Sequence, residues 1–255
     1  MDYFDLTGQV AVVTGASAGL GVQMACALAS KGANLVLLAR RQNLLDEKAA
    51  YITQKYGVKV LPLSCDITDT ARIKEAVRLT ISTFGRVDIL VNNAGTGTTA
   101  PTLEITDEQF ENEIKIDLFG TFACSREFGE EMLKRRYGRI INISSMYGLV
   151  GNMAATCSPY HAAKGGVVNL TRALAAEWGR SGVTVNCICP GYFHTDLTKD
   201  LLETEWFQQY ARRAIPVGRY GVEGELDTCV LFLASPHSRY ITGQSIAIDG
   251  GYTSI

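Results

Sequence analysis

The 255-residue chain lacks three features that would indicate particular partners or compartments. It has no basic stripe, because 24 scattered Lys and Arg residues face 26 Asp and Glu residues, so we expect no nucleic-acid partner. Its longest apolar runs, such as LVLLA after Asn34, are far shorter than a membrane span, so we expect no membrane partner. The opening MDYFDLTGQVAVV does not follow the basic-then-apolar order of a signal peptide. We therefore expect a cytoplasmic protein whose partner is a small molecule.

Paired cysteines are also missing. The chain has seven cysteines, an odd number, and none has the CxxC spacing of a metal or redox pair. This pattern favours thiols in a reducing cytoplasm and no metal site. Cys187, Cys189 and His194 could be imagined as zinc ligands, but two small core thiols on one strand explain the same pattern.

What the chain does contain is a regular alternation of short apolar runs with longer amphipathic segments. The apolar runs are nearly continuous, as expected for parallel strands that are covered on both faces. This rhythm is typical of βαβ winding. It predicts an α/β fold in one domain over residues 1–255, a Rossmann-like doubly wound parallel sheet of seven strands with helices on both faces. The seven runs lie in QVAVVTG, ANLVLLA, VKVLPLSCD, DILVNNAG, GRIINISS, GVTVNCICPG and GQSIAIDGG.

The glycine cluster TGASAGLG, residues 14–21, follows the first predicted strand and opens a helix. Backbone amides and the positive end of the helix dipole suit a diphosphate there, and glycines permit close approach. The spacing of Gly15, Gly19 and Gly21 is looser than the GxGxxG fingerprint. An ordinary tight turn between strand and helix is therefore the alternative.

The end of the second predicted strand indicates which dinucleotide would bind. An acidic residue there would bond a ribose 2′-hydroxyl, whereas arginine accommodates a 2′-phosphate. The strand ends in Ala39, Arg40 and Arg41, which favours NADP(H) over NAD(H), with Arg40 the first candidate and Arg41 the second. A solvated arginine pair is the alternative. Asp66, after the third strand, would accept from the adenine amino group or cap the next helix.

The segment YHAAK places Tyr160 and Lys164 four residues apart, on one face of a predicted helix. A phenol titrates near pH 10, so a base useful at neutral pH needs its phenolate stabilised by roughly 3 pH units. A nearby lysine and a cationic nicotinamide could supply this. Taken alone, the pair is common on helix surfaces.

Five motifs occur together in one order: TGASAGLG, NNAG at 92–95, INISS at 141–145, YHAAK, and PGYFHT at 190–195. This combination resembles the short-chain dehydrogenase/reductase family, and the resemblance extends from LTGQVAVVTG to the closing DGG. Within that family, DLTGQVAVVTGAS, the aspartate of IDL and the FLAS…DGG ending are most similar to gluconate 5-dehydrogenase-type members. Those relatives often end the second strand in aspartate, which this chain does not.

The resemblance implies an acid/base role for Tyr160, a hydrogen bond from Ser145 to the same substrate oxygen, and a ribose-binding, pKa-lowering role for Lys164. Ser144 would shape the strand end, and Ile188 would lie by the nicotinamide. Together with the glycine loop and the arginine pair, the motifs predict a set of cofactor contacts. These are Gly15, Ser17, Gly19, Leu20, Gly21, Arg40, Arg41, Asp66, Ile67, Asn92, Ala94, Gly95, Tyr160, Lys164, Pro190, Gly191, Phe193 and Thr195.

Two departures from the family pattern affect this prediction. Asp117, in KIDLFG, stands where most members have an asparagine that completes a proton relay to the lysine. Asp117 would be either a relay member with an added charge or a compensated substitute, because a carboxylate accepts hydrogen bonds but does not donate them. The stretch between Ser145 and Tyr160 is also slightly longer than is common, which would reshape the substrate mouth.

A substrate lid is expected over about residues 196–217. Its aromatic residues would suit a bulky apolar substrate such as a hydroxysteroid, and its basic residues a sugar acid or an acyl carrier. An amphipathic helix that closes on itself explains the same pattern. The aromatic residues are Trp206, Phe207 and Tyr210, and the basic ones are Lys199, Arg212 and Arg213.

The function predicted from these features is hydride transfer between NADP(H) and a secondary alcohol or ketone, with a sugar acid or polyol as substrate. A hydroxysteroid dehydrogenase and a 3-oxoacyl-thioester reductase are the alternatives of the same class. A non-catalytic NADP(H)-sensing protein is the alternative of another class. The family resemblance also implies a homo-oligomer, a tetramer or a dimer.

Overall fold

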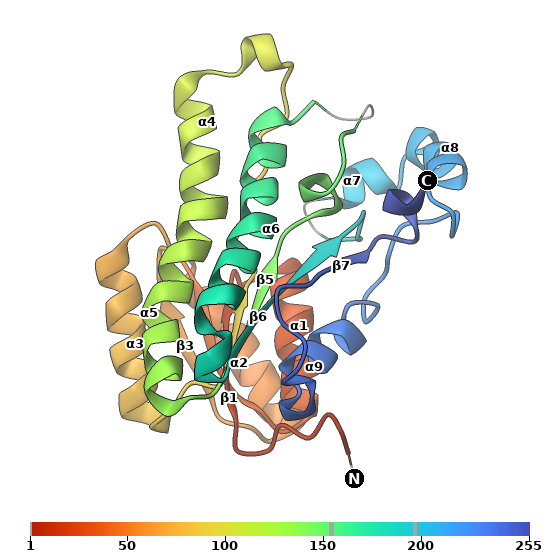
Figure 1. Cartoon of the computed structure of the whole chain (residues 1–255). Helices are drawn as coiled ribbons and strands as arrows, with labels where there is room; N and C mark the ends of the chain where they lie inside the picture. The colour runs from red at the N-terminus through yellow and green to blue at the C-terminus, as the bar shows by residue number, and fades with distance from the viewer. Residues whose placement is uncertain (1, 153–155, 196–197) are drawn as a thin grey trace.

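A seven-stranded parallel sheet runs through the computed structural model, which describes residues 2–152, 156–195 and 198–255 (Figure 1). The strand order is β3-β2-β1-β4-β5-β6-β7, so the winding reverses between β1 and β4. The predicted doubly wound sheet is therefore confirmed. The strands are β1 Val10–Thr14, β2 Asn34–Ala39, β3 Val60–Ser64, β4 Ile89–Asn92, β5 Gly138–Ile143, β6 Val183–Pro190 and β7 Ser245–Ile248.

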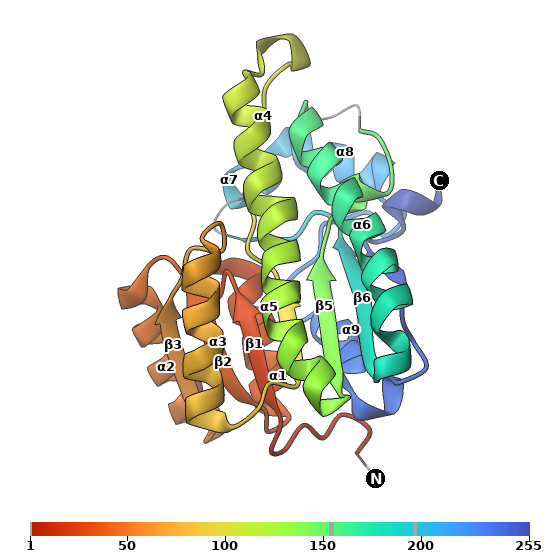
Figure 2. The same ribbon diagram turned by 60° about the vertical axis from the view of Figure 1, so that its left-hand side comes forward.

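Helices cover both faces of the sheet. The α-helices are α1 Gly19–Ser30, α2 Gln42–Tyr56, α3 Thr70–Phe84, α4 Asp107–Glu113, α5 Gly120–Arg135, α6 Ser158–Trp178, α7 Lys199–Leu202, α8 Glu205–Ala214 and α9 Asp227–Ala234. One apolar core joins the sheet to α1, α2 and α9, and a second joins its other face to α3, α5 and α6 (Figure 2). Alternate residues of each buried strand enter opposite cores, which is why the strands read as continuous apolar runs.

Helices α4 and α5 are joined without a loop. Thr106 and Gln109 form a capping box at the start of α4. A π-helical segment, η2 Ile114–Phe119, then leads directly into α5, and η2 packs against α6. Because a π-helical turn inserts an extra residue into the helix, it re-aims the side chains around it and is frequent at functional sites. Asp117 lies in this segment.

The carboxyl ends of the parallel strands meet at one edge of the sheet, which is where ligands bind in open α/β folds. The glycine loop follows β1, NNAG follows β4, INISS ends β5 and PGYFHT follows β6. Short 3₁₀ turns, η3 Met146–Gly148 and η6 Tyr252–Ser254, lie near this edge together with α7 and α8 (Figure 1). The topology thus gathers all the singled-out motifs at one end of the molecule.

The predicted lid corresponds in part to α7 and α8, while its residues 196–197 lie outside the described residues. Its aromatic side chains do not act as one set. Phe207 is 1% exposed and packs with Leu202 and Ala211 in a small apolar cluster, whereas Trp206 is 55% exposed. The amphipathic-helix interpretation therefore accounts for Phe207. No helix in the described part of the chain is both long and apolar enough to cross a membrane.

Candidate active site

The glycine loop after β1 has a backbone that side chains would obstruct. Gly15 and Gly19 adopt positive φ angles of 67° and 59°. At Gly21, a Cβ atom would lie 2.5 Å from the Gly15 carbonyl oxygen and 2.6 Å from Nδ2 of Asn93. The close approach that the sequence suggested is thus a property of this loop, and α1 begins within it.

Thr14 and Asn93, which the motif-based prediction omitted, hold the glycine loop against the end of β4. The Thr14 hydroxyl accepts hydrogen bonds from the backbone N–H groups of Asn93 (2.9 Å) and Ala94 (3.0 Å). Nδ2 of Asn93 donates to the Thr14 carbonyl at 3.0 Å. The signal available in the sequence was the polar residue at the end of each strand, Thr14 before the glycines and Asn93 within NNAG.

Asn92 is buried and its side chain is used within the protein. Its Nδ2 donates to Oγ of Ser125 at 2.8 Å and to Oδ1 of Asn142 at 2.9 Å. Asn142 in turn donates to the hydroxyl of Thr171 at 2.9 Å. This network joins β4, α5, β5 and α6, so the predicted contact of Asn92 with a cofactor depends on its backbone rather than its amide.

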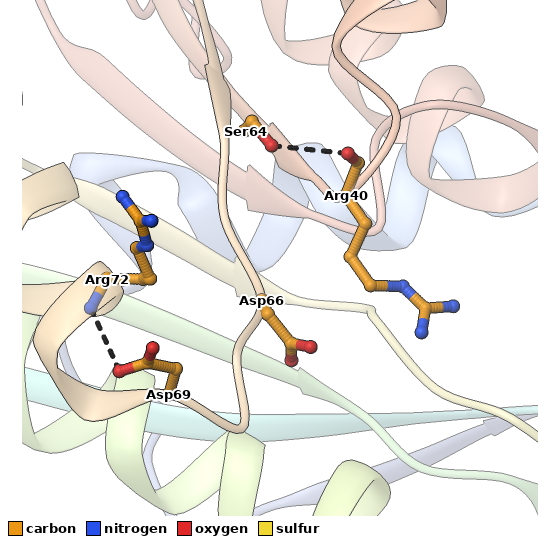
Figure 3. A pocket seen from close by; sticks show the side chains of 5 residues that line it. All are labelled: Arg40, Ser64, Asp66, Asp69 and Arg72. Atoms are coloured by element: carbon orange, nitrogen blue, oxygen red, sulfur yellow. Dashed lines mark hydrogen bonds between the residues drawn. The ribbon is translucent and has the colours of Figure 1, made fainter.

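A cavity of about 390 Å³ lies beside the ends of β2 and β3 (Figure 3). It is lined by Arg40, Ser64, Asp66, Asp69 and Arg72. In Figure 3 the side chains of Arg40 and Asp66 extend to one side of the chain that carries Asp66, and Asp69 and Arg72 lie on the other. The cavity thus has an arginine and a carboxylate together at the predicted adenosine position.

Asp66 does not cap a helix, so that alternative is wrong. The N-cap of α3 is Asp69, whose carboxylate accepts from the N–H groups of Ala71 and Arg72. The Asp66 carboxylate accepts from the backbone and hydroxyl of Thr68 at 2.9 and 2.8 Å. The hydrogen bond from the Thr68 backbone lowers the pKa of Asp66, so this group is an anionic acceptor at neutral pH.

Arg41 differs from Arg40 in what it contacts. Its Nη2 donates to Oγ of Ser17 at 3.0 Å, which places this guanidinium against the glycine loop. Arg40 is exposed and lines the cavity. Two guanidinium groups beside a loop of small residues form a set that can bind a phosphorylated dinucleotide. The strand end offers no carboxylate in their place, because β2 ends at Ala39.

The remaining residues predicted to contact the cofactor fall into two groups, those that lie close to another loop or strand end and those that are packed in the core. Thr195 lies against the glycine loop, because a Cβ on Gly19 would be 3.7 Å from the Thr195 Cβ. Gly191 is packed so closely on the residue that follows β7 that a Cβ there would lie 2.7 Å from the Asp249 Cα. The others are placed mainly by packing. Leu20 is half-buried against the core, and Ile67, Pro190, Phe193 and Ile188 are buried.

Ser145, Tyr160 and Lys164 lie together. Ser145 follows β5, and Tyr160 and Lys164 lie in the first turns of α6. Nζ of Lys164 is 5.4 Å from the centre of the Tyr160 ring. Ser145 accepts from the Tyr147 N–H at 3.1 Å and lowers the pKa of Tyr160 through a side-chain hydrogen bond. The longer intervening stretch, of which residues 153–155 lie outside the described residues, leaves this convergence intact.

Lys164 is almost completely buried and is paired with a buried carboxylate. Its Nζ lies 3.1 Å from Oδ2 of Asp117 and donates to the Ile143 carbonyl at 3.2 Å. Burial alone would lower the pKa of Lys164, but Tyr160 and Asp117 outweigh burial and raise it. Ser144 donates to the Lys164 carbonyl at 2.8 Å, consistent with its expected structural part. Lys164 is therefore a fixed cation.

Asp117 contacts both the lysine and the loop after β4. Its Oδ1 accepts from the Thr96 N–H at 2.8 Å. A Cβ on Gly95 would lie 3.1 Å from the same Oδ1 and 3.3 Å from Nζ of Lys164. The carboxyl group of Asp117, at the position where the resemblance placed an asparagine, is thus buried directly beside the ammonium group of Lys164.

Tyr160 is stabilised in its protonated form. Burial raises the pKa of the Tyr160 phenol, Lys164 and Ser145 oppose this, and Asp117 adds to it. The lowered pKa that a tyrosine base would need is therefore not produced by these protein groups alone. As a neutral phenol, Tyr160 is suited to give a proton to a substrate oxygen.

A group of hydroxyls lies next to Tyr160. The Tyr147 ring packs edge-on to Tyr160, with centroids 6.4 Å apart. The Tyr147 hydroxyl is 2.5 Å from that of Tyr192 and accepts from Nδ2 of Asn152 at 2.6 Å. Burial raises the pKa of both Tyr147 and Tyr192, so their hydroxyls stay neutral. These groups can both donate and accept hydrogen bonds.

The cysteines considered as metal ligands are separated from the histidine. Cys187 and Cys189 are both fully buried, with their Sγ atoms 3.8 Å apart. His194 instead lies 2.9 Å from a carboxylate oxygen of Glu203. Across residues 2–152, 156–195 and 198–255, no three His, Cys, Asp or Glu side chains are grouped so as to hold a metal ion.

Residues 15–253 match the protein family described as Enoyl-(Acyl carrier protein) reductase. The chain is 39% identical over 257 residues to galactitol 2-dehydrogenase (L-tagatose-forming) of Cereibacter sphaeroides, covering 99% of each protein. It is 38% identical over 248 residues to the 3-oxoacyl-[acyl-carrier-protein] reductase of a Synechocystis species, covering 96% of this chain and 97% of that one. The similarity thus spans nearly the whole chain, and the names of these relatives give different substrates.

Solved structures show the same architecture. A short-chain type dehydrogenase/reductase from Mycobacterium marinum superposes with a TM-score of 0.94 at 35% identity, covering 100% of this chain and 99% of that chain. A gluconate 5-dehydrogenase from Burkholderia cenocepacia, in complex with NADP and tartrate, superposes with a TM-score of 0.95 at 33% identity, covering 100% and 98%. The gluconate 5-dehydrogenase resemblance noted in the sequence is therefore matched by a structural neighbour.

Proposed function

Because the chain belongs to the short-chain dehydrogenase/reductase family and is an oxidoreductase, we propose that it transfers hydride between NADP(H) and a sugar acid or polyol. The reacting groups would be a secondary alcohol and the corresponding ketone. The observation that carries the proposal is the grouping of Ser145, Tyr160 and Lys164 at the carboxyl edge of the sheet. A binding protein without turnover has no need for this acid, its oxygen-binding neighbour and a buried cation together.

The preference for NADP(H) rests on the residues around the cavity of Figure 3. Arg40 and Arg41 would bind a 2′-phosphate, and Asp66 would accept from the adenine amino group. The glycine loop would hold the diphosphate through backbone N–H groups. When bound, the cofactor supplies the hydride, and the protein supplies orientation and the proton. The NADP complex of the gluconate 5-dehydrogenase neighbour supports this choice.

In the direction of reduction, Tyr160 would donate its proton to the carbonyl oxygen while Ser145 holds that oxygen in place. Lys164 would bind the ribose hydroxyls of the cofactor and keep a positive charge beside the phenolate that remains. Asp117 fixes Lys164 at 3.1 Å and thereby sets where that charge lies. Each of these roles is a proposal about residues that the fold has brought together.

The substrate class is supported by the hydroxyls around Tyr160. Tyr147, Tyr192 and Asn152 present neutral donors and acceptors next to the reacting group. A polyhydroxylated chain can exchange hydrogen bonds with such a surface, whereas a steroid carries few groups that could do so. The galactitol 2-dehydrogenase relative and the tartrate-bound neighbour point to the same class.

The test is NADPH oxidation with a keto-sugar acid, a ketohexose, a ketosteroid and a 3-oxoacyl thioester, with NADH assayed in parallel. We expect turnover with one of the first two and a loss of about 100-fold or more in Tyr160→Phe, because that change removes the proton donor. Equal NADPH affinity of the two proteins is the control. Turnover with the steroid or thioester alone would overturn the sugar assignment, and full activity of Tyr160→Phe would overturn the mechanism.

A further inference from the structure

Glu113, the last residue of α4, is a buried acid that none of the proposed catalytic roles uses. Its side chain is 0% exposed. Its Oε2 accepts from the backbone N–H and the hydroxyl of Thr98, at 3.0 and 2.8 Å. Its Oε1 is buried and has no hydrogen-bond partner among the residues the structure describes. Because an ionised carboxylate with a bare buried oxygen is costly, this environment favours the neutral acid.

Asp117 lies one helical turn later and binds the same loop. Oδ1 of Asp117 holds the N–H of Thr96, and Oε2 of Glu113 holds that of Thr98. The second oxygen of each acid, Oδ2 of Asp117 and Oε1 of Glu113, is buried and receives no hydrogen bond of regular geometry among the described residues. Each acid thus uses one oxygen to fix the loop. The other oxygen of Asp117 is ion-paired with Nζ of Lys164 at 3.1 Å, whereas Oε1 of Glu113 has no partner among the described residues.

The groups facing Glu113 come from three elements. Asp117 lies on η2, Lys164 and Tyr160 lie on α6, and Cys157 immediately precedes α6. Among these, one cation, Lys164, faces two carboxyl groups. Burial raises the pKa of Glu113, and the charge of Asp117 raises it further although Thr98 and Lys164 oppose this. Two carboxyl groups beside a single cation commonly bind one proton between them.

We infer that Glu113 and Asp117 form a buried carboxyl pair that holds one proton, on Glu113, and supplies it, through Lys164, to Tyr160 during turnover. The second half of this statement rests on the proposed reductase function. Glu113 acts through Asp117 and Lys164, so it is a positioning residue for the proton rather than a catalytic residue. While Glu113 is protonated, the pair places one negative charge beside the phenol and not two. This matters because an ionised Glu113 would raise the pKa of Tyr160.

The substrate carbon gains a hydride, the O–H bond of Tyr160 breaks, and its proton goes to the substrate oxygen, leaving a phenolate. The phenolate takes a proton from the Lys164 ammonium, directly or through water, and Lys164 takes the proton of the carboxyl pair. Both carboxylates are then anionic until water returns one proton to Glu113.

The pair is tested first without turnover, by infrared difference spectroscopy of the whole protein against Glu113→Gln. Glutamine keeps a neutral donor and an acceptor for Thr98 but cannot release a proton. We expect the C=O stretch of a protonated carboxyl at neutral pH in the wild type, lost in Glu113→Gln and kept in Glu111→Gln, an exposed acid of the same helix. Absence of that band in the wild type at neutral pH overturns the pair.

Proton supply is tested by kinetics of the same variants. In Glu113→Gln we expect kcat to fall by about tenfold or more, with a larger solvent isotope effect, while KM and NADPH affinity stay within about twofold. An unchanged kcat would show that Glu113 only clamps the loop and would overturn proton supply. If the wild type itself turned over no substrate, the proposed function would fail, proton supply would fail with it, and the infrared band would still decide the pair.

Discussion

The two ends of the sheet edge that carries the proposed site differ in the kinds of groups that form them. Around β1 and β2 the site consists of glycines, backbone N–H groups and exposed arginines. Around β5 and α6 it consists of buried ionisable side chains, with Lys164 and Asp117 at 5% and 0% side-chain exposure. A cofactor contributes its own charges when it binds, so the first end can stay open to water. Proton transfer needs charges fixed in a medium of low dielectric constant, which only the second end provides.

This difference predicts how a substitution at each end affects cofactor binding, folding and activity. Removing a charge from the exposed end removes an interaction with the cofactor and leaves the fold intact. Removing a charge from the buried end also leaves its partner unpaired, so folding and activity fall together. Substitution of a glycine in the loop should have an intermediate effect, because a glycine contributes space for the backbone rather than a charge.

The largest effect is expected from Asp117→Ala. Lys164 would lose its buried partner and the Thr96 N–H its acceptor, so the free energy of unfolding should fall by about 3–5 kcal/mol. Urea-induced unfolding measures this, and Asp117→Asn, which retains an acceptor for Thr96, should lose less. Near-wild-type turnover and stability in Asp117→Ala would exclude Asp117 from the site.

Arg40→Ala should act on cofactor binding alone. Losing one charge-assisted contact with a 2′-phosphate costs about 1.5–3 kcal/mol, a roughly 10- to 100-fold rise in the Kd of NADPH. The Kd of NADH and the Tm should stay unchanged. Arg72→Ala, on the other side of the same cavity (Figure 3), is the matched control. An equal effect of both variants would show that the cavity attracts the cofactor by general charge, not by a contact with Arg40.

Gly21→Ala sharpens the comparison because it adds volume without changing charge. Its Cβ would meet the Gly15 carbonyl at 2.5 Å, so the loop must shift, at a cost of about 1–3 kcal/mol in the free energy of unfolding. NADPH affinity should fall as well, since the displaced backbone is the proposed binding site of the diphosphate. Gly179→Ala, where a Cβ meets nothing within 4 Å, serves as the control and should be neutral or slightly stabilising.

The smallest effect concerns the pH dependence of stability at the buried end. Burial raises the pKa of Glu113 above its value in the unfolded chain, so its contribution is complete below that ordinary value and declines as pH rises toward the folded-state pKa. Glu113→Gln lacks this decline. Its free energy of unfolding relative to the wild type, measured by urea-induced unfolding at several pH values, should therefore increase as the pH rises above the ordinary pKa of glutamate. The exposed Glu111→Gln should show no such trend, and a flat difference for Glu113→Gln would mean that Glu113 is ionised in the folded protein.

Local patterns were sufficient to predict the sheet and the order of its motifs. The seven apolar runs became seven strands, and the polar groups at their carboxyl ends came together because parallel strands all point to one edge. Helix α2 ends at Tyr56, where Gly57 in the left-handed region closes it. Local chemistry decides such boundaries, so the sequence carries them.

The part of the site that could not be predicted depends on which side chains face each other across elements. For example, Nδ2 of Asn92 donates to Ser125 and Asn142, which the sequence did not reveal. Glu113 went unnoticed in an acidic segment, although Glu113, Asp117 and Thr121 recur at helical spacing on the buried face. Only the π-helical segment and the packing of α6 on it reveal that this acidic stripe faces Lys164.

The sequence by itself determined the sheet, the glycine loop, the arginine pair at the end of β2 and the one-turn spacing of Tyr160 and Lys164, because each follows from neighbours along the chain. Tertiary structure decided which charges are buried, and therefore how Tyr160 and Glu113 titrate. A pKa depends on solvent exclusion and on charges a few ångströms away in space, and those neighbours come from segments as distant as η2 and α6.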